Sequence, residues 1–218
     1  MGLPFTVEQF YGVFRDYNTT LWPAQTVLVA FAVAAIVLVI VPRRHSGAGV
    51  SAILAFLWSW LALAYHLAFF AAINPLAYVF AGVSLAGALI FLWQGVVLRR
   101  LEFRLAPNAR SAVGVMLVAF ALVIYPAWSI FAGHPYPDLP TFGLPCPTTL
   151  FTVGLLALLV RPYPRSPLVV PVLWSFVGAQ AAFLLDVPQD LSLLAAGAIG
   201  VGLIARSKAG GAKPGTPL

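Results

Sequence analysis

The stretch TVLVAFAVAAIVLVIVPRR (residues 26–44) decides the class of fold, because residues 27–41 carry no polar side chain and two arginines follow soon after. A helix needs about 20 apolar residues to cross the hydrocarbon core of a bilayer. The whole chain has the same character, since 61% of its 218 residues are hydrophobic and only 8% are charged. Ordinary soluble domains carry about 25% charged residues, and disorder requires low hydrophobicity. The sequence therefore predicts an all-α integral membrane protein.

Hydropathy predicts a bundle of seven transmembrane helices. Their ranges are 22–41, 51–73, 75–98, 111–132, 147–160, 168–185 and 189–205. The connections are short, so residues 22–205 are expected to form one transmembrane domain between an N-terminal segment, 1–21, and a C-terminal tail, 206–218. The tail is rich in glycine, lysine and proline, which predicts disorder in the cytoplasm. A single cysteine, Cys146, excludes a disulfide scaffold.

The basic residues predict the orientation of this bundle. Of the 12 lysines and arginines, 11 fall on one side of the predicted spans and only Arg15 falls on the other. Basic connections stay in the cytoplasm, so we expect the N-terminus outside and the C-terminus inside. The net charge of +6 is then a topology signal and predicts no nucleic-acid partner. Five of the six acidic residues, Asp190 among them, are expected at the outer side, and Glu102 at the inner side.

The N-terminal segment has an apolar face at helical spacing. That face consists of Val7, Phe10, Tyr11, Phe14 and Tyr17. Thr6 and Gln9 have the spacing of a capping box, which marks a helix start. These features predict an amphipathic interfacial helix that lies on the outer membrane surface. A lid over an outward-facing cavity is the functional alternative.

The fifth predicted span is too short for the bilayer. Residues 147–160 reach about 21 Å as a helix, whereas the hydrocarbon core is about 30 Å thick. Residues 133–146 precede this span and contain four prolines, so they cannot be helical throughout. Irregular backbone at depth must be buried in protein or line a wet cavity. We therefore expect a re-entrant segment beside an outward-facing cavity, with Cys146 at its floor; local thinning of the bilayer is the alternative.

Polar side chains from five of the spans fall in one layer of the outer half when helix rise is counted from the inner ends. They are Gln25, His66, Tyr125, Cys146 and Gln180, with Thr148 and Thr149 just beneath. Polar groups in a span are costly and usually face the bundle interior, so these seven residues are the predicted substrate-binding residues. Structural explanations stay open: the glutamines and threonines suit hydrogen bonds between helices, and a lone histidine suits a satisfied core position.

Cys146 begins a predicted helix, where a thiolate is stabilised and binds soft metals. Cys146 and His66 are therefore a candidate pair for Cu(I), Zn(II) or Hg(II), although two ligands are few for a metal site. The sequence contains no CxxC, HxxxH, GxSxG or HExxH motif. We predict no catalytic residue and no enzyme, and no cofactor is assigned.

Four segments together resemble an uncharacterised family of small bacterial multi-pass membrane proteins, a domain of unknown function. They are FTVEQF (5–10), WPAQ (22–25), YHLAFFAAINP (65–75) and PCPTTLFT (145–152). The resemblance implies a protein of the bacterial inner membrane and supplies neither an activity nor a functional residue.

We therefore expect a transporter or permease-like protein that binds a small solute or a soft metal ion in an outward-facing cavity. The alternative is a non-transporting sensor or an accessory subunit of a larger membrane complex, with the lipid bilayer and a membrane protein or a second copy of the chain as partners.

Overall fold

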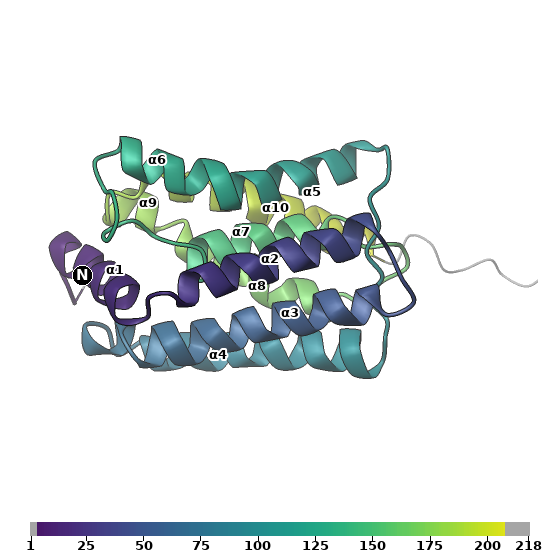
Figure 1. Cartoon of the computed structure of the whole chain (residues 1–218), viewed down its shortest axis with the longest axis horizontal. Helices are drawn as coiled ribbons and strands as arrows, with labels where there is room; N and C mark the ends of the chain where they lie inside the picture. Colours follow the sequence, from purple (N-terminus) through teal and green to yellow (C-terminus); the bar gives the residue numbers. More distant parts are fainter. Residues whose placement is uncertain (1–3, 208–218) are drawn as a thin grey trace, which may run out of the picture.

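The computed structural model describes residues 4–207, so most of the tail predicted to be disordered lies outside the described residues. The described chain is helical almost throughout. Its longer helices are α1 (Val7–Thr20), α2 (Ala24–Ile40), α3 (Ser46–Trp60), α4 (Ala77–Phe91), α5 (Ala109–Ala119), α7 (Pro145–Leu156), α8 (Ser166–Gly178) and α10 (Leu191–Arg206). Shorter helices are α6 (Tyr125–Phe131) and α9 (Ala181–Leu184). The helices α2 to α10 run along the long axis of the molecule (Figure 1).

Within residues 4–207, five helical stretches are long and apolar enough to cross a membrane. They are Ser46–Ala72, Ala77–Val97, Ala109–Phe131, Ser166–Leu184 and Pro188–Arg206. They correspond to five of the predicted spans, and they are helices of a membrane protein. The other two predicted spans are shorter helices: α2 forms a pair with α1 that is bent by 87°, and α7 is a short apolar helix.

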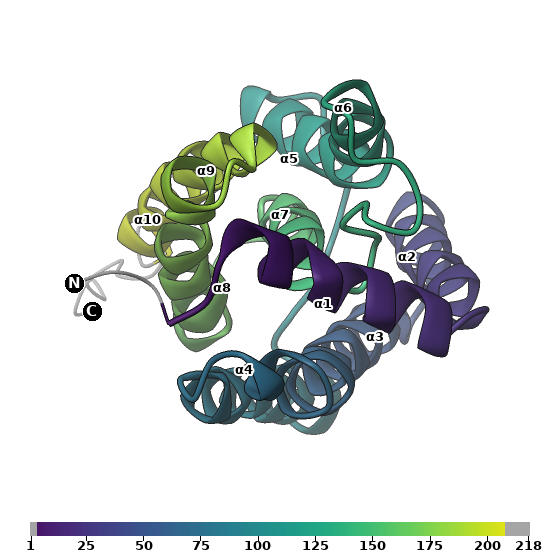
Figure 2. The ribbon, with the colours of Figure 1, turned by 90° about the vertical axis from the view of Figure 1, so that its left-hand side faces the viewer.

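Helix α7 is the centre of the fold. The end-on view shows α2, α3, α4, α8, α10 and α5 arranged around it (Figure 2). Every residue of α7 except Cys146 is buried, as expected of a helix that is apolar on all sides. Because the ring separates α7 from any surrounding lipid, its 12 residues do not have to match the thickness of a bilayer.

Irregular chain covers both ends of α7. On one side, the proline-rich connection after α6 runs inward before α7 begins (Figure 1). On the other, the chain leaves the helix earlier than predicted, and residues after Leu156 pair with the connection between α4 and α5. The N–H of Arg104 donates to the carbonyl of Leu158 at 2.9 Å, and the N–H of Val160 donates to that of Glu102 at 2.8 Å. These bonds satisfy backbone groups that a short helix leaves free.

Helix α1 lies across one end of the bundle (Figure 2). Its capping box is confirmed, since the Thr6 hydroxyl accepts the N–H of Gln9 and the Gln9 side chain accepts the N–H of Thr6. Most of the predicted apolar face packs against the bundle, with Phe14 and Tyr17 buried, whereas Val7 is 41% exposed; the position of the helix on a membrane surface stays a prediction. The indole N–H of Trp60 donates to the Tyr17 hydroxyl at 2.7 Å. This face is therefore occupied by protein, which is the arrangement of the lid alternative.

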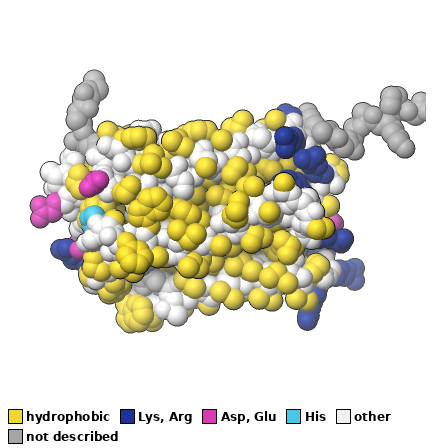
Figure 3. Space-filling model, turned by 90° about the horizontal axis from the view of Figure 1, so that it is seen from above, with side chains coloured by type: hydrophobic (Ala, Val, Ile, Leu, Met, Phe, Trp, Pro, Cys, Tyr) yellow, Lys and Arg dark blue, Asp and Glu magenta, His cyan; other side chains and the backbone are white. Residues whose placement is uncertain are grey.

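Charged side chains gather at the two ends of the bundle. On the face shown in Figure 3, arginines concentrate at one end and most carboxylates at the other, with an apolar band between them. Arg15 lies at the acidic end and forms an ion pair with Asp138 at 2.7 Å.

Candidate functional site

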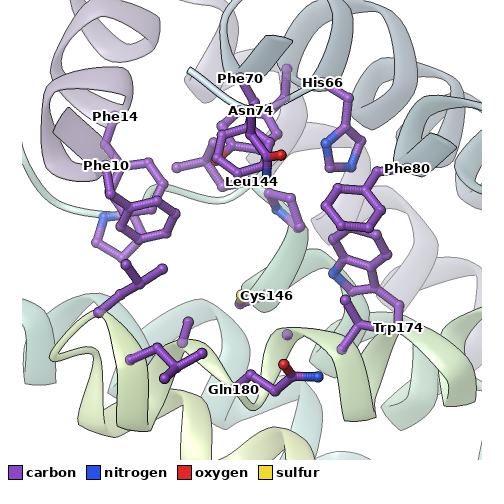
Figure 4. Close-up of a pocket in the computed structure, with 18 of the residues that line it drawn as sticks. Phe10, Phe14, His66, Phe70, Asn74, Phe80, Leu144, Cys146, Trp174 and Gln180 are labelled. Atoms are coloured by element: carbon purple, nitrogen blue, oxygen red, sulfur yellow. The ribbon is translucent and has the colours of Figure 1, made fainter. Parts of the chain in front are cut away.

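A cavity of about 210 Å³ lies beneath α1, at the acidic end of the bundle. Six apolar aromatic side chains line it, namely Phe5, Phe10, Phe14, Phe70, Phe80 and Trp174. The polar residues of the wall are Tyr65, His66, Asn74, Tyr125, Cys146 and Gln180. In Figure 4, Phe10 and Phe14 face a column of His66, Phe80 and Trp174 across the cavity, and Cys146 lies between the two sides.

The cavity is reached from one side of the bundle. Among its lining residues, Leu76 at the start of α4 and Leu184 in α9 are 57% and 51% exposed, and Gln180 is also exposed. Elsewhere α1 and the connection 140–145 cover it. The exposed part of the wall therefore lies between the start of α4 and the segment that follows α8.

Two π-helical turns place the polar residues at this depth. The first, Leu61–Leu67, carries Tyr65 and His66, and the second, Phe120–Ile124, ends immediately before Tyr125. A proline ring clashes with the carbonyl four residues before it in an α-helix, so the wider turn accommodates Pro126 at the start of α6. Such turns re-aim the side chains that follow them and occur often at functional sites.

A buried carboxyl group lies behind the cavity wall. Asp190 is 1% exposed; it accepts a hydrogen bond from the Tyr125 hydroxyl at 2.6 Å and one from the Cys146 thiol at 3.3 Å. The expectation that Asp190 belongs with the outer acidic residues places it at the correct end but misses its burial. A buried carboxyl needs such partners, so Tyr125 and Cys146 have a structural role as well as a place in the wall.

Two buried polar side chains in the wall lack partners. His66 and Trp174 are 1% and 6% exposed, and their ring centroids lie 5.0 Å apart. Neither nitrogen of the His66 imidazole, nor the indole N–H of Trp174, has a hydrogen-bond partner within residues 4–207. An unsatisfied buried polar group costs about 1–3 kcal/mol. A hydrogen-bonding group bound in the cavity would remove this cost.

The predicted polar layer divides into two parts. The cavity brings together Cys146, His66, Tyr125 and Gln180. Gln25 lies apart from it and donates to the backbone carbonyl of Asn18 at 3.3 Å. Thr148 and Thr149 are fully buried below the floor and do not line the cavity. Helix rise predicts the depth of a side chain but not the direction in which it points, so Gln25, Thr148 and Thr149 lie outside the cavity wall and their part in binding stays a prediction.

Asn18 connects α1, which covers the cavity, to the proline-rich connection that forms part of the cavity wall. No sequence pattern marked this residue as part of the site. This fully buried residue donates from its side-chain amide to the carbonyls of Pro137 at 2.7 Å and Leu139 at 2.8 Å. Its amide oxygen accepts the hydroxyl of Thr141 at 2.7 Å. Asn18 thus holds the proline-rich connection that borders the cavity to α1, in addition to the ion pair of Arg15 with Asp138.

The predicted metal site consists of two candidate ligands. Cys146 and His66 line the same cavity, but the thiol donates to Asp190. In the part of the chain that the structure describes, no group of three or more histidine, cysteine, aspartate and glutamate side chains is placed to hold a metal ion.

These features define an all-helical membrane protein with a central buried helix and an aromatic cavity at one end. A family model described as a family of unknown function (DUF6064) matches residues 7–210, so the chain belongs to that family. This match confirms the resemblance to an uncharacterised family. No curated protein and no solved structure matches the chain.

Proposed function

We propose that this protein is a multi-pass protein of the bacterial inner membrane that binds a small solute in its end cavity, as a transporter or permease does. In this proposal α2 and α7 complete seven crossings, the basic end is cytoplasmic, and the cavity opens at the outer side. The separation of charge in Figure 3 supports this orientation, because basic connections remain inside.

The observation that carries the proposal is the pair of unpartnered polar rings in a largely apolar wall. His66 and Trp174 are buried, and both line the cavity. Ligand sites are typically apolar pockets in which a few polar groups fix orientation. The wall therefore favours an apolar solute with one hydrogen-bonding group over a soft metal ion.

Transport in this scheme requires the floor to move. Thr148, Thr149 and Leu150 are fully buried directly after Cys146 and fill the bundle below the cavity. The arrangement is that of a site closed toward the basic end. Helix α7 forms this floor and contacts α5, α8 and α10. In the proposed transport cycle, α7 shifts against these three helices and so opens the cavity toward the basic end.

Binding is tested with 4-fluorophenol and fluorobenzene, which share a ring and differ in the hydroxyl group. The purified protein is heated with each compound, and ligand binding raises the unfolding free energy by RT ln(1 + [L]/Kd), about 2.7 kcal/mol at 100 times Kd. We expect 4-fluorophenol to stabilise the native protein more than fluorobenzene does, and His66→Phe to abolish that difference. Thr149→Val, outside the cavity, is the control. Equal effects of the two compounds on the native protein would contradict the assignment.

Transport is tested separately, in cells that express the native protein, His66→Ala or Thr149→Val at equal membrane levels. Mass spectrometry of the small-molecule pools should show a compound whose accumulation depends on the native protein and on Thr149→Val alike, and which His66→Ala loses. Identical pools in all three strains would argue against transport. The hypothesis that the cavity binds a soft metal ion is tested by measuring the metal content of the native protein and of Cys146→Ser. Equal metal content in the two proteins would reject that hypothesis.

A further inference from the structure

A second hollow lies at the opposite end of the bundle from the cavity. It measures about 390 Å³ and is formed by the connections 42–48 and 99–104 together with Val160. Four arginines line it, namely Arg43, Arg44, Arg99 and Arg104. The hollow also contains His45 and one carboxylate, that of Glu102. Two connections that are distant in sequence thus bring four positive charges to one concave surface.

The four arginines of the hollow have no protein partner among the described residues, as is also true of Arg100, Arg161 and Arg206, whereas two other arginines at this end do have one. Arg110 donates to the carbonyl of Leu159 at 2.6 Å, and Arg165 donates to the hydroxyl of Ser207 at 2.8 Å. Among the described residues, none of the four guanidinium groups in the hollow makes a hydrogen bond or an ion pair. The positive-inside rule concerns how many basic residues a connection holds; it does not require them to converge. Unpaired charges gathered in this way are suited to an anion.

Backbone donors add to the positive field. Helix α3 begins at Ser46, and the first-turn residues Ser46, Gly47 and Ala48 line the hollow. The N–H of Ser46 donates to the carbonyl of Arg43 at 3.0 Å, whereas those of Gly47 and Ala48 have no acceptor among residues 4–207. Free N–H groups at a helix N-terminus favour phosphate and other anions.

We propose that this hollow binds the phosphate of an anionic phospholipid headgroup. Guanidinium groups match phosphate oxygens in a bidentate geometry, and basic pockets between transmembrane helices bind anionic headgroups. A lipid is favoured over a soluble phosphate because exposed valines adjoin the arginines: Val160 lines the hollow and is 36% exposed, and Val41, next in the chain to Pro42 of the lining, is 52% exposed. Acyl chains can lie on these side chains while the phosphate occupies the hollow. The site is independent of the outer cavity and of the proposed transport.

Glu102 gives the hollow a preference among anionic lipids. A carboxylate beside four arginines repels a doubly charged phosphate monoester and accepts a hydroxyl group. Phosphatidylglycerol carries a phosphate diester and two hydroxyl groups, so it fits this composition better than phosphatidic acid does.

The experiment measures lipid retention by the full-length protein in detergent, using native mass spectrometry with added phosphatidylglycerol or phosphatidylcholine. Each arginine near an anionic lipid contributes a factor of about five in binding, so Arg43→Gln with Arg44→Gln should weaken phosphatidylglycerol binding about 25-fold, and Arg99→Gln with Arg104→Gln similarly. The control is Arg100→Gln, in the same connection but outside the hollow. Thermal unfolding of each variant establishes that it is folded.

Three results would overturn the proposal. Equal retention of phosphatidylcholine and phosphatidylglycerol would show that charge is not recognised, and an equal loss in Arg100→Gln would show that the hollow is not the site. Binding of glycerol 3-phosphate as tight as that of the lipid would assign the hollow to a soluble phosphate. In support, Glu102→Gln should raise the binding of phosphatidic acid relative to phosphatidylglycerol.

Discussion

Replacing Gly154 by alanine tests the tight contact between the central helix α7 and its neighbour α5. A Cβ atom at residue 154 would lie 2.9 Å from the carbonyl oxygen of Gly114 and 3.0 Å from the backbone nitrogen of Val118. A Cβ atom at residue 114 would lie 2.7 Å from the carbonyl oxygen of Gly154. These neighbours are backbone atoms, which cannot rotate away as the end of a side chain can. The two helices must therefore move apart to accept a methyl group.

The size of the effect follows from two opposing contributions. Overpacking a well-packed interior costs about 1–3 kcal/mol, whereas alanine in place of glycine favours a helix by roughly 0.5–1 kcal/mol. Gly154→Ala should thus destabilise the protein by about 1 kcal/mol, within a range of roughly 0–2.5 kcal/mol. Gly202 on α10 is the matched control, because a Cβ there meets nothing within 4 Å. Gly202→Ala should stabilise the protein by up to about 1 kcal/mol.

The assay is thermal unfolding in a mild detergent, followed by near-ultraviolet circular dichroism. The two alanine variants should shift the unfolding temperature in opposite directions. If Gly154→Ala were as stable as Gly202→Ala, α7 would not lie against α5 at backbone distance, and the central position of α7 would be refuted.

Three further substitutions have expected outcomes in the same assay. Asn18→Ala removes three of the hydrogen bonds that join α1 to the proline-rich connection and should cost about 2–3 kcal/mol; an unchanged unfolding temperature would show that the Asn18 side chain does not hold α1 there. Tyr125→Phe removes the 2.6 Å bond to Asp190 and should cost about 1.5–3 kcal/mol, whereas Tyr78→Phe, whose side chain is 66% exposed, should have no effect. Arg15→Gln breaks an ion pair in which the arginine side chain is 58% exposed and should leave the unfolding temperature unchanged, since solvent screens such pairs.

Much of the fold was predictable from hydropathy, because long apolar runs are a direct physical requirement of crossing a bilayer. The same reasoning could not place α7 at the centre of the ring. A short apolar helix and a short crossing have the same composition, and the contact of Gly114 with Gly154 joins two helices that are separated in sequence. Nor did the amphipathic pattern of α1 distinguish a lipid surface from a protein surface, since both accept an apolar face.

The sequence predicted the depth of the candidate site along the bundle, but it predicted only some of the residues that line it. Cys146, His66, Tyr125 and Gln180 line one cavity, as their common depth indicated. Trp174 was overlooked because a tryptophan in an apolar span attracts no notice unless its N–H is known to lack a partner. A signal for Asp190 was present: it begins the last span beside Pro188 at the same end as Tyr125 and Cys146.

The most direct measurement of the central claim, an outward-facing cavity above a solid floor, is cysteine accessibility in intact cells. Cys146→Ser removes the single native cysteine, after which Gln180→Cys and Thr149→Cys are introduced one at a time. A small membrane-impermeant methanethiosulfonate reagent added outside should modify the cysteine at 180, which lines the cavity, and leave that at 149, which is fully buried. Modification at 180 only in inverted vesicles, or equal modification at both positions, would contradict the account.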